Sequence, residues 1–381
     1  MIPCQRHLFD IPPDVAYLNC AYMSPLMKPV VEAGVAALAR KAHPWELTPD
    51  KFFTGPDEFR ATAAQLLDCP ADCVAIVPSA SYGIATAARN LPVTKNQGIL
   101  VLAEQFPSNY YAWQRLAEET GARLKIVPWP EDHDWTAAVL DSLTADMAIA
   151  ALPNVQWTSG GRLDLVRIGE ACRNLGVALA LDLTQSLGAL PFSAREVQPD
   201  FAVAACYKWL LGPYSIGLLY VAPKWQHGRP LEENWIQRAN ARDFASLILY
   251  NGNYDDGARR FDMGERSNFA LLPAAVRAMQ QLLEWEVAQI SETTGALNRH
   301  LAEAAAETGF SAPAEPWRAP HYLALRRKQP IPRELPEMLA REKVFVSVRG
   351  SSIRVSPHVY NTTADCERLI GCLRSIASVS R

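Results

Sequence analysis

Two neighbouring stretches decide the fold: "VALALDLTQ" (residues 177–185) and "DFAVAACYKWLLGP" (residues 200–213). Each holds a continuous apolar run, which is typical of a strand buried on both faces of a parallel sheet. Asp182 ends the first run and Lys208 follows the second. Because ligands bind beyond the carboxyl ends of parallel strands, we expect these two charged side chains to share one ligand-binding edge.

The same pattern extends to both sides of these stretches. Apolar runs alternate with segments of helical spacing, and Gly121 and Gly176 stand where such helices commonly end. The alternation predicts an α/β fold with a large, mostly parallel sheet sandwiched by helices. The further apolar runs are 99–103, 146–153 and 214–221, and the helical segments between them are 108–121 and 164–176.

Composition excludes several classes of protein. The net charge of −3 gives no reason to expect nucleic acid as a partner, and no apolar run is long enough to span a membrane. The N-terminus lacks the charged-then-apolar order of a signal peptide. The eight cysteines are dispersed, and neither Cys-x-x-Cys nor His-Glu-x-x-His occurs. We therefore expect a cytoplasmic protein with reduced thiols and no metal site.

Lys208 and Asp182 suit one cofactor, pyridoxal 5′-phosphate (PLP). A lysine amine forms an imine, the internal aldimine, with the PLP aldehyde, and an aspartate keeps the pyridine nitrogen protonated so that the ring withdraws electrons. Taken singly, each residue also fits a plainer role, a snorkelling surface lysine or a turn aspartate. The pair at one sheet edge favours the cofactor.

The chain around this pair resembles the class V aminotransferase family of PLP enzymes, which adopt the PLP-dependent transferase fold type I. Relatives include kynureninases, cysteine desulfurases, selenocysteine lyases and isopenicillin N epimerases. The resemblance covers most of residues 17–370. It rests on "ALDLTQSLGALPFSAREVQPDFAVAACYKWLLGPYSIGLLYV" (180–221), "VPSASYGI" (77–84), "EQFPSNYYAW" (104–113), "FDMGERSNF" (261–269) and "SSIRVSPHVYNT" (351–362).

The resemblance implies a role for each matched residue around the cofactor. Lys208 and Asp182 are the catalytic pair. Ala80 and Ser81 open a helix whose free N–H groups can hold the phosphate. The other implied cofactor contacts are Phe106 stacked on the ring, Gln185 donating to its phenolic oxygen, Tyr207 at the phosphate, and Trp157 beside the ring.

The resemblance also implies substrate and partner contacts. Arg354 would grip the α-carboxylate of an amino-acid substrate with two parallel hydrogen bonds, and Asn19 would touch the same substrate. Ser267 and Asn268 match residues that reach a neighbouring subunit's cofactor. We therefore expect a homodimer with shared active sites.

The spacing pattern changes beyond residue 270, which predicts a second, smaller domain. A long helical stretch (271–309) is followed by short strands and a closing helix (363–377), as in an α+β domain. We expect an N-terminal segment, 1–20, associated with the small domain, a large PLP-binding domain, 21–260, and the small C-terminal domain, 261–381.

Two reactions remain open at the sequence level. Transamination of a small amino acid, through an external aldimine and removal of the Cα proton by Lys208, is the preferred hypothesis. A lyase that cleaves at Cβ, of the kynureninase or C–S lyase type, begins with the same proton abstraction. A PLP-fold binding protein without catalysis is a remote third reading, which the intact Lys208, Asp182 and Arg354 argue against.

One chemistry is disfavoured by departures from the family pattern. Cysteine desulfurases carry a cysteine shortly before the carboxylate arginine, whereas this chain has Ser351 and Ser352 there. They also usually stack a histidine on the ring, where this chain has Phe106. Kynureninases share the phenylalanine and the Tyr207–Lys208 pair, but they have a histidine where this chain has Gln185.

Overall fold

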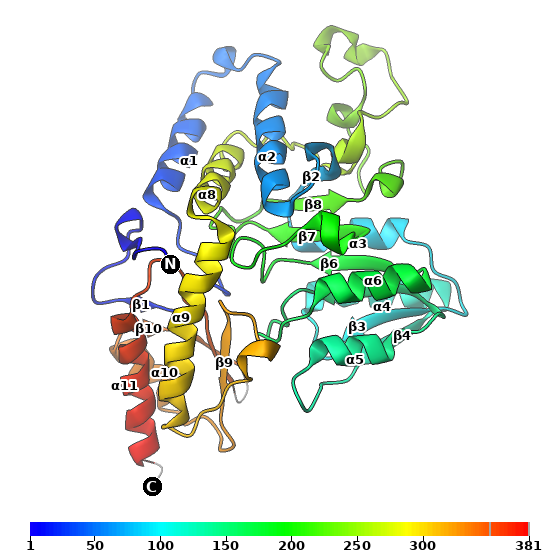
Figure 1. Cartoon of the computed structure of the whole chain (residues 1–381). Coiled ribbons are helices and arrows are strands. Elements are labelled where there is room, and N and C mark those ends of the chain that lie inside the picture. Colours follow the sequence, from blue (N-terminus) through cyan, green and yellow to red (C-terminus); the bar gives the residue numbers. More distant parts are fainter. Residues whose placement is uncertain (350–351, 380–381) are drawn as a thin grey trace.

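A seven-stranded sheet forms the centre of the molecule, as seen in a computed structural model that describes residues 1–349 and 352–379 (Figure 1). The strand order is β2-β8-β7-β6-β5-β3-β4, and β8 runs antiparallel to both of its neighbours while the remaining pairs are parallel. The predicted large, mostly parallel sheet is therefore confirmed. Its strands are β2 (Val74–Val77), β3 (Gly98–Leu102), β4 (Arg123–Val127), β5 (Met147–Pro153), β6 (Ala178–Asp182), β7 (Phe201–Ala205) and β8 (Gly217–Val221).

Helices cover both faces of this sheet, as the continuous apolar strands require. Side chains alternate along β3: Ile99 and Val101 join a core with α3 and α4, while Leu100 and Leu102 join another with α2, α5, α6 and α8. These helices are α2 (Lys51–Leu67), α3 (Ala80–Asn90), α4 (Tyr111–Thr120), α5 (Trp135–Ser142), α6 (Leu165–Leu175) and α8 (Leu271–Trp285), and the short α7 (Ala194–Val197) follows β6.

The C-terminal part builds a second, smaller layer. Strands β11 (Ser347–Arg349), β12 (Ser352–Val355) and β9 (Leu323–Arg326) form an antiparallel sheet, and β1 (Ala16–Tyr17) pairs in parallel with β10 (Val344–Phe345). A third core, which includes Leu18, Leu301, Leu323 and Ile353, lies among these strands and helices. The helices are α9 (Val287–Ala306), α10 (Leu335–Arg341) and α11 (Thr363–Val379).

The N-terminal segment contributes to both layers, because Ala16 and Leu18 belong to the third core while Phe9 belongs to the core beneath the large sheet. In contrast, α8 contributes Leu272 and Leu282 to the core beneath the large sheet, beside α1 (Lys28–Arg40) and α2 (Figure 1). The division at residues 20 and 260 stays a prediction. Short 3-10 helices occupy Arg6–Leu8, Pro44–Glu46, Ala71–Cys73, Pro107–Asn109, Pro223–Trp225, Trp235–Gln237, Phe244–Ile248, Gly257–Phe261 and Glu315–Trp317.

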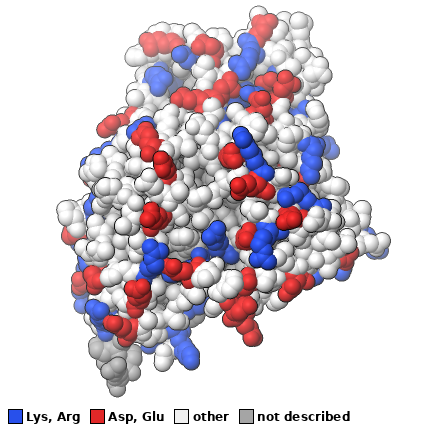
Figure 2. Space-filling view, viewed as in Figure 1, with Lys and Arg blue, Asp and Glu red and all other residues white. Residues whose placement is uncertain are grey.

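The surface carries both signs of charge, interspersed over the face shown in Figure 2. No helix among the described residues has both the length and the apolar character needed to cross a membrane.

Candidate active site

A cavity of about 410 Å³ lies at the carboxyl ends of β5, β6 and β7. It is lined by Pro153, Asp182, Ala205 and Lys208, so the structure brings the two charged residues to one edge, as expected from the sequence. A larger cavity of about 840 Å³ lies at the opposite edge of the sheet. Its buried acid, Asp200, is already bound by the chain's own donors, so we place the active site in the smaller cavity.

Lys208 is almost buried, with 6% of its surface exposed. Its Nζ lies 5.4 Å from the centroid of the Phe106 ring and 5.5 Å from that of Tyr207. Burial lowers the pKa of Lys208 to about 8, although Asp182 acts to raise it. About a tenth of this amine is therefore neutral at pH 7 and about half at pH 8, and the neutral amine is the form that attacks an aldehyde.

Asp182 ends β6 as a buried carboxylate. Its Oδ1 accepts a hydrogen bond from the Thr184 N–H at 2.9 Å, and the Thr184 hydroxyl accepts one from Ala205 N–H. Burial raises the pKa of Asp182, although Thr184 and Lys208 lower it. A cationic N–H partner would therefore stabilise the ionised form of this buried carboxylate.

The first turn of α3 borders the same cavity, where Ser79, Ala80 and Ser81 line it. The helix begins at Ala80, and its cap is Ser79, whose hydroxyl accepts a hydrogen bond from Tyr82 N–H and lies 2.9 Å from the Ser81 hydroxyl. Sequence reasoning chose Ser81 and missed Ser79, although a serine before a helix is a recognisable cap signal. The N–H groups and hydroxyls of this turn suit an anion.

Gln185 lines the cavity but already has two partners. Its Nε2 donates to the Ala21 carbonyl at 3.2 Å, and its Oε1 accepts from Trp209 Nε1 at 3.0 Å. One amide hydrogen remains available, since the side-chain amide has two. The bond to a phenolic oxygen of the cofactor stays a prediction.

Two aromatic rings form a wall of the cavity, with Phe106 and Trp157 edge to face at a centroid distance of 5.3 Å. The Trp157 indole donates to the Glu104 carbonyl at 2.6 Å, at a non-glycine residue with positive φ. Sequence reasoning missed Glu104, because backbone conformation has no direct sequence signal there. It also missed Thr184, Tyr214 and Ser215, which line the cavity too.

Arg354 approaches this wall from the small layer. Its Nη1 donates to the Trp157 carbonyl at 3.1 Å, and its guanidinium carbon lies 5.5 Å from the Trp157 ring centroid. The residue is 3% exposed, and its Nε is buried without a hydrogen-bond partner among the described residues. An arginine with spare donors at this place fits a carboxylate ligand. Asn19 Oδ1 accepts a hydrogen bond at 2.8 Å from the hydroxyl of Ser347, which pairs with Arg354 between β11 and β12. Neither Asn19 nor Arg354 is among the residues that line the cavity.

Ser267 and Asn268 do not line the Lys208 cavity. They border a separate cavity of about 210 Å³ beside α1, α2 and α8. Ser267 Oγ donates to the Phe52 carbonyl at 2.5 Å, and Asn268 Oδ1 accepts a hydrogen bond at 2.9 Å from the N–H of Leu271, the first residue of α8. Within one chain they therefore line a different cavity from Lys208, and their contact with a partner's cofactor stays a prediction.

The described residues therefore fit PLP. A reactive amine, a buried carboxylate, an aromatic face and a helix N-terminus converge on one cavity. Among the described residues, no group of histidine, cysteine or acidic side chains could hold a metal ion.

Comparison with known proteins decides the family. The family model described as aminotransferase class-V matches residues 50–369. The chain belongs to this family. As a member of this family, the protein is a PLP-dependent enzyme, either an aminotransferase or a related lyase.

Its relatives include enzymes of both kinds. It is 25% identical over 370 residues to the uncharacterized aminotransferase YcbU of Bacillus subtilis, covering 96% of this chain and 95% of that protein. It is 28% identical over 272 residues to the kynureninase of Deinococcus radiodurans, covering 68% of this chain and 64% of that enzyme. The apo cysteine desulfurase of Thermococcus onnurineus NA1 has the same fold, with a TM-score of 0.84 at 17% identity and coverage of 100% and 99%.

Reconstitution of the cofactor-free enzyme with PLP is expected to accelerate about fivefold from pH 7 to pH 8 and to level off above about pH 9. The reason is that the neutral amine of Lys208 reacts, and its pKa of about 8 lies in this interval. Stopped-flow absorbance of the bound cofactor measures the rate. A lysine with an ordinary pKa would instead give a rate that keeps rising about tenfold per pH unit through pH 9, contradicting the lowered pKa.

Proposed function

We propose that this enzyme is an aminotransferase that acts on a small amino acid. Its similarity to YcbU over nearly the full length of both chains carries the proposal, together with the position of Arg354 beside the Trp157–Phe106 wall. A kynureninase-like lyase is the second candidate, which the similarity to a kynureninase and the Tyr207–Lys208 pair favour. A cytoplasmic location stays an expectation from the sequence.

Each residue of the proposed site has a physical task. Bound PLP supplies an aldehyde and an electron-withdrawing ring. Arg354 binds the α-carboxylate of the substrate and so orients its Cα. Lys208 Nζ accepts the proton from the substrate Cα. In amino transfer, Lys208 would then donate this proton to the C4′ carbon of the cofactor. Asp182 holds a proton at the ring nitrogen, and the Ser79–Ser81 turn with Tyr207 binds the phosphate.

A panel of amino acids tests the reaction class. Without an amino acceptor, an aminotransferase is expected to release no more than one 2-oxo acid per subunit, because the amino group stays on the enzyme. Adding a 2-oxo acid acceptor should restore continuous turnover. Chromatography of the 2-oxo acids and an ammonia assay follow the two products. Continuous release of a 2-oxo acid and ammonia without acceptor would instead assign a lyase that eliminates a group from Cβ, and continuous release of alanine with a carboxylic acid would assign a kynureninase-like lyase that hydrolyses the bond at Cβ.

L-Cysteine in the same panel is expected to give little sulfide, because persulfide formation needs an accessible thiolate. Cys20, which sequence reasoning did not connect with the site, lies closest: its Sγ donates to the Lys208 carbonyl at 3.8 Å. Burial raises the pKa of Cys20, and it raises that of Cys206 to about 12. Ser352 is buried and Ser351 lies outside the described residues. Fast sulfide release that one Cys→Ala change abolishes would contradict this expectation.

We also propose that two copies share their active sites. Helix α1 exposes Val31, Val35 and Leu38 at helical spacing, an apolar stripe that a second copy would cover. The location of Ser267 and Asn268 away from their own Lys208 supports the same arrangement.

Mixing two inactive variants tests the sharing. Lys208→Ala and Asn268→Ala homodimers are each expected to have low activity, whereas a mixed dimer regains one site with both residues intact. Steady-state rates before and after subunit exchange measure this recovery, and sedimentation establishes the dimer. An active Asn268→Ala homodimer, or no recovery on mixing, would contradict shared sites.

A further inference from the structure

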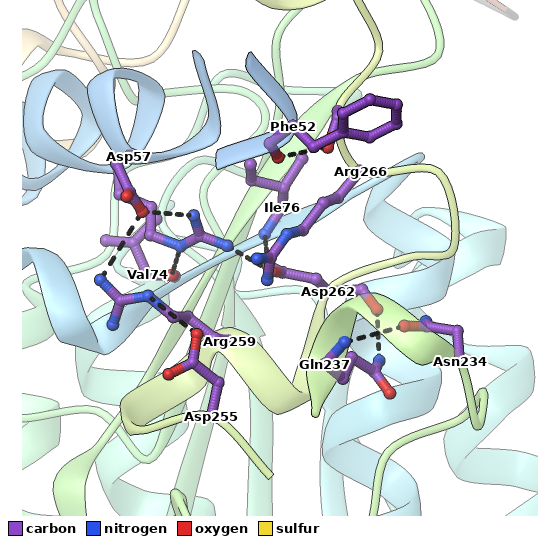
Figure 3. Close-up of polar contacts among 12 residues, drawn as sticks. Phe52, Asp57, Val74, Ile76, Asn234, Gln237, Asp255, Arg259, Asp262 and Arg266 are labelled. Atoms are coloured by element: carbon purple, nitrogen blue, oxygen red, sulfur yellow. Dashed lines mark hydrogen bonds and ion pairs between the residues drawn. The ribbon is translucent and has the colours of Figure 1, made fainter. Parts of the chain in front are cut away.

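The edge strand β2 is covered by two side chains and one backbone N–H instead of by another strand. Edge strands leave backbone groups unpaired, and proteins must cover them. Here Ile76 N–H donates to Asp262 Oδ1 at 2.7 Å and Arg60 Nε donates to the Val74 carbonyl at 3.1 Å (Figure 3). In addition, Met263 N–H donates to the Ile76 carbonyl at 2.9 Å. The outward groups of β2 therefore depend on Asp262 and Arg60.

Asp262 is the hub of this cluster. Its Oδ2 forms ion pairs with Arg60 Nη2 and with Arg266 Nη1, and all three residues are fully buried. The Asp262 carbonyl also accepts a hydrogen bond from Gln237 Nε2 at 2.7 Å. Because removing one partner of a buried charge cluster leaves another charge unpaired, these residues hold each other in one arrangement. Helix α2, strand β2 and the 262–266 loop are thereby fixed together.

The cluster connects two parts of the proposed site. Strand β2 ends at Val77 and leads directly into the Ser79–Ser81 turn. On the other side, Arg266 precedes Ser267 and Asn268. The 262–266 loop has a second contact, in which Gly264 N–H donates to the Glu232 carboxylate at 2.5 Å. Burial and this same Glu232 carboxylate raise the pKa of Tyr82, in the first turn of α3.

We propose that Asp262, with Arg60 and Arg266, is a positioning cluster for the phosphate-binding turn. It fixes the end of β2, so that the N–H groups and hydroxyls of the Ser79–Ser81 turn are oriented before the cofactor arrives. The proposal rests on the proposed role of that turn in phosphate binding. Asp262 itself touches no reacting atom, and its action passes through the backbone of β2.

Comparing PLP with pyridoxal, which lacks the phosphate, isolates this role. Asp262→Asn keeps the shape of the side chain and removes its charge. We expect the preference of the cofactor-free protein for PLP over pyridoxal to fall about tenfold, because a displaced turn loses oriented donors. Hydrogen exchange of the amides in residues 76–83 of the cofactor-free protein should accelerate at the same time. A merely structural role would weaken both ligands equally.

Asp365→Asn provides a matched control in the small layer. Asp365 is also buried, accepts two hydrogen bonds from Arg6 Nη1 at 3.0 and 3.1 Å, and accepts the Thr362 N–H at 3.0 Å. Loss of the Asp365 charge should lower the melting temperature but leave the preference for PLP over pyridoxal unchanged. Gln237→Ala loses the contact with the Asp262 carbonyl without exposing a buried charge, and it should lower the preference in the same direction if Asp262→Asn does not fold.

The outcomes distinguish the phosphate-binding role of the Ser79–Ser81 turn from the positioning role of Asp262. A wild-type protein that binds PLP and pyridoxal equally would show that the Ser79–Ser81 turn does not hold the phosphate. A wild type that prefers PLP, with a folded Asp262→Asn or Gln237→Ala variant that keeps the full preference, would overturn the positioning role alone.

Discussion

Replacing Lys208 with alanine abolishes the covalent link to the cofactor and lowers turnover by at least about a thousandfold. Lys208 is the nearly buried amine that faces Phe106 and Tyr207 in the cavity, and its pKa is lowered to about 8. In the proposed mechanism the same Nζ binds the cofactor and takes the Cα proton, so one change would remove two functions. PLP should still enter the cavity, because the phosphate turn and Asp182 remain.

Mass spectrometry after borohydride reduction measures the link. The wild type should gain the mass of reduced cofactor on a peptide that contains Lys208, and Lys208→Ala should gain none. Lys95→Ala, at an exposed position that does not line the cavity, is the matched control and should keep both the label and the turnover. A label that persists on another lysine, or a protein that takes up no PLP, would overturn the assignment.

The sequence predicted those features of the site that follow from strand order. Asp182 and Lys208 each follow a continuous apolar run, and the carboxyl ends of parallel β6 and β7 meet at one edge. The pairing of β8 as an antiparallel strand changed neither position, since Lys208 precedes it. Local periodicity thus carried enough information to place Asp182 and Lys208 at one edge of the sheet.

Contacts between distant segments had no such signal. Arg354 reaches Trp157 only because the small layer packs beside the carboxyl edge of the large sheet. Gln185 is held by Ala21 and Trp209, a geometry that depends on how the N-terminal segment crosses the site. Asp262 looked like an ordinary loop residue in the sequence, and its place at the edge of β2 came only from tertiary structure. Residues brought together by packing, and not by periodicity, are those that pattern reading missed.

Replacing Asp182 with asparagine is expected to slow turnover about a hundredfold while the covalent link at Lys208 forms normally. Asparagine keeps an oxygen for the Thr184 N–H, so the end of β6 should stay in place. What is lost is the negative charge that keeps the ring nitrogen protonated, and with it the electron withdrawal that makes the Cα proton acidic. The effect should therefore fall on the proton-abstraction step, and a larger isotope effect with Cα-deuterated substrate should accompany it.

The same substitution should stabilise the cofactor-free protein at pH 7. Burial raises the pKa of Asp182 above its value in the unfolded chain, so the folded state binds more protons between the two values. Stability is then present below the unfolded pKa and is lost as pH rises through the folded pKa, because Lys208 and Thr184 offset only part of the cost of ionising a buried carboxylate. Asparagine removes this loss, and its advantage in urea unfolding should vanish below about pH 4. Wild-type turnover in Asp182→Asn would show that the charge of Asp182 does not assist the reaction. A variant less stable than the wild type at pH 7 would show that this charge does not destabilise the cofactor-free protein.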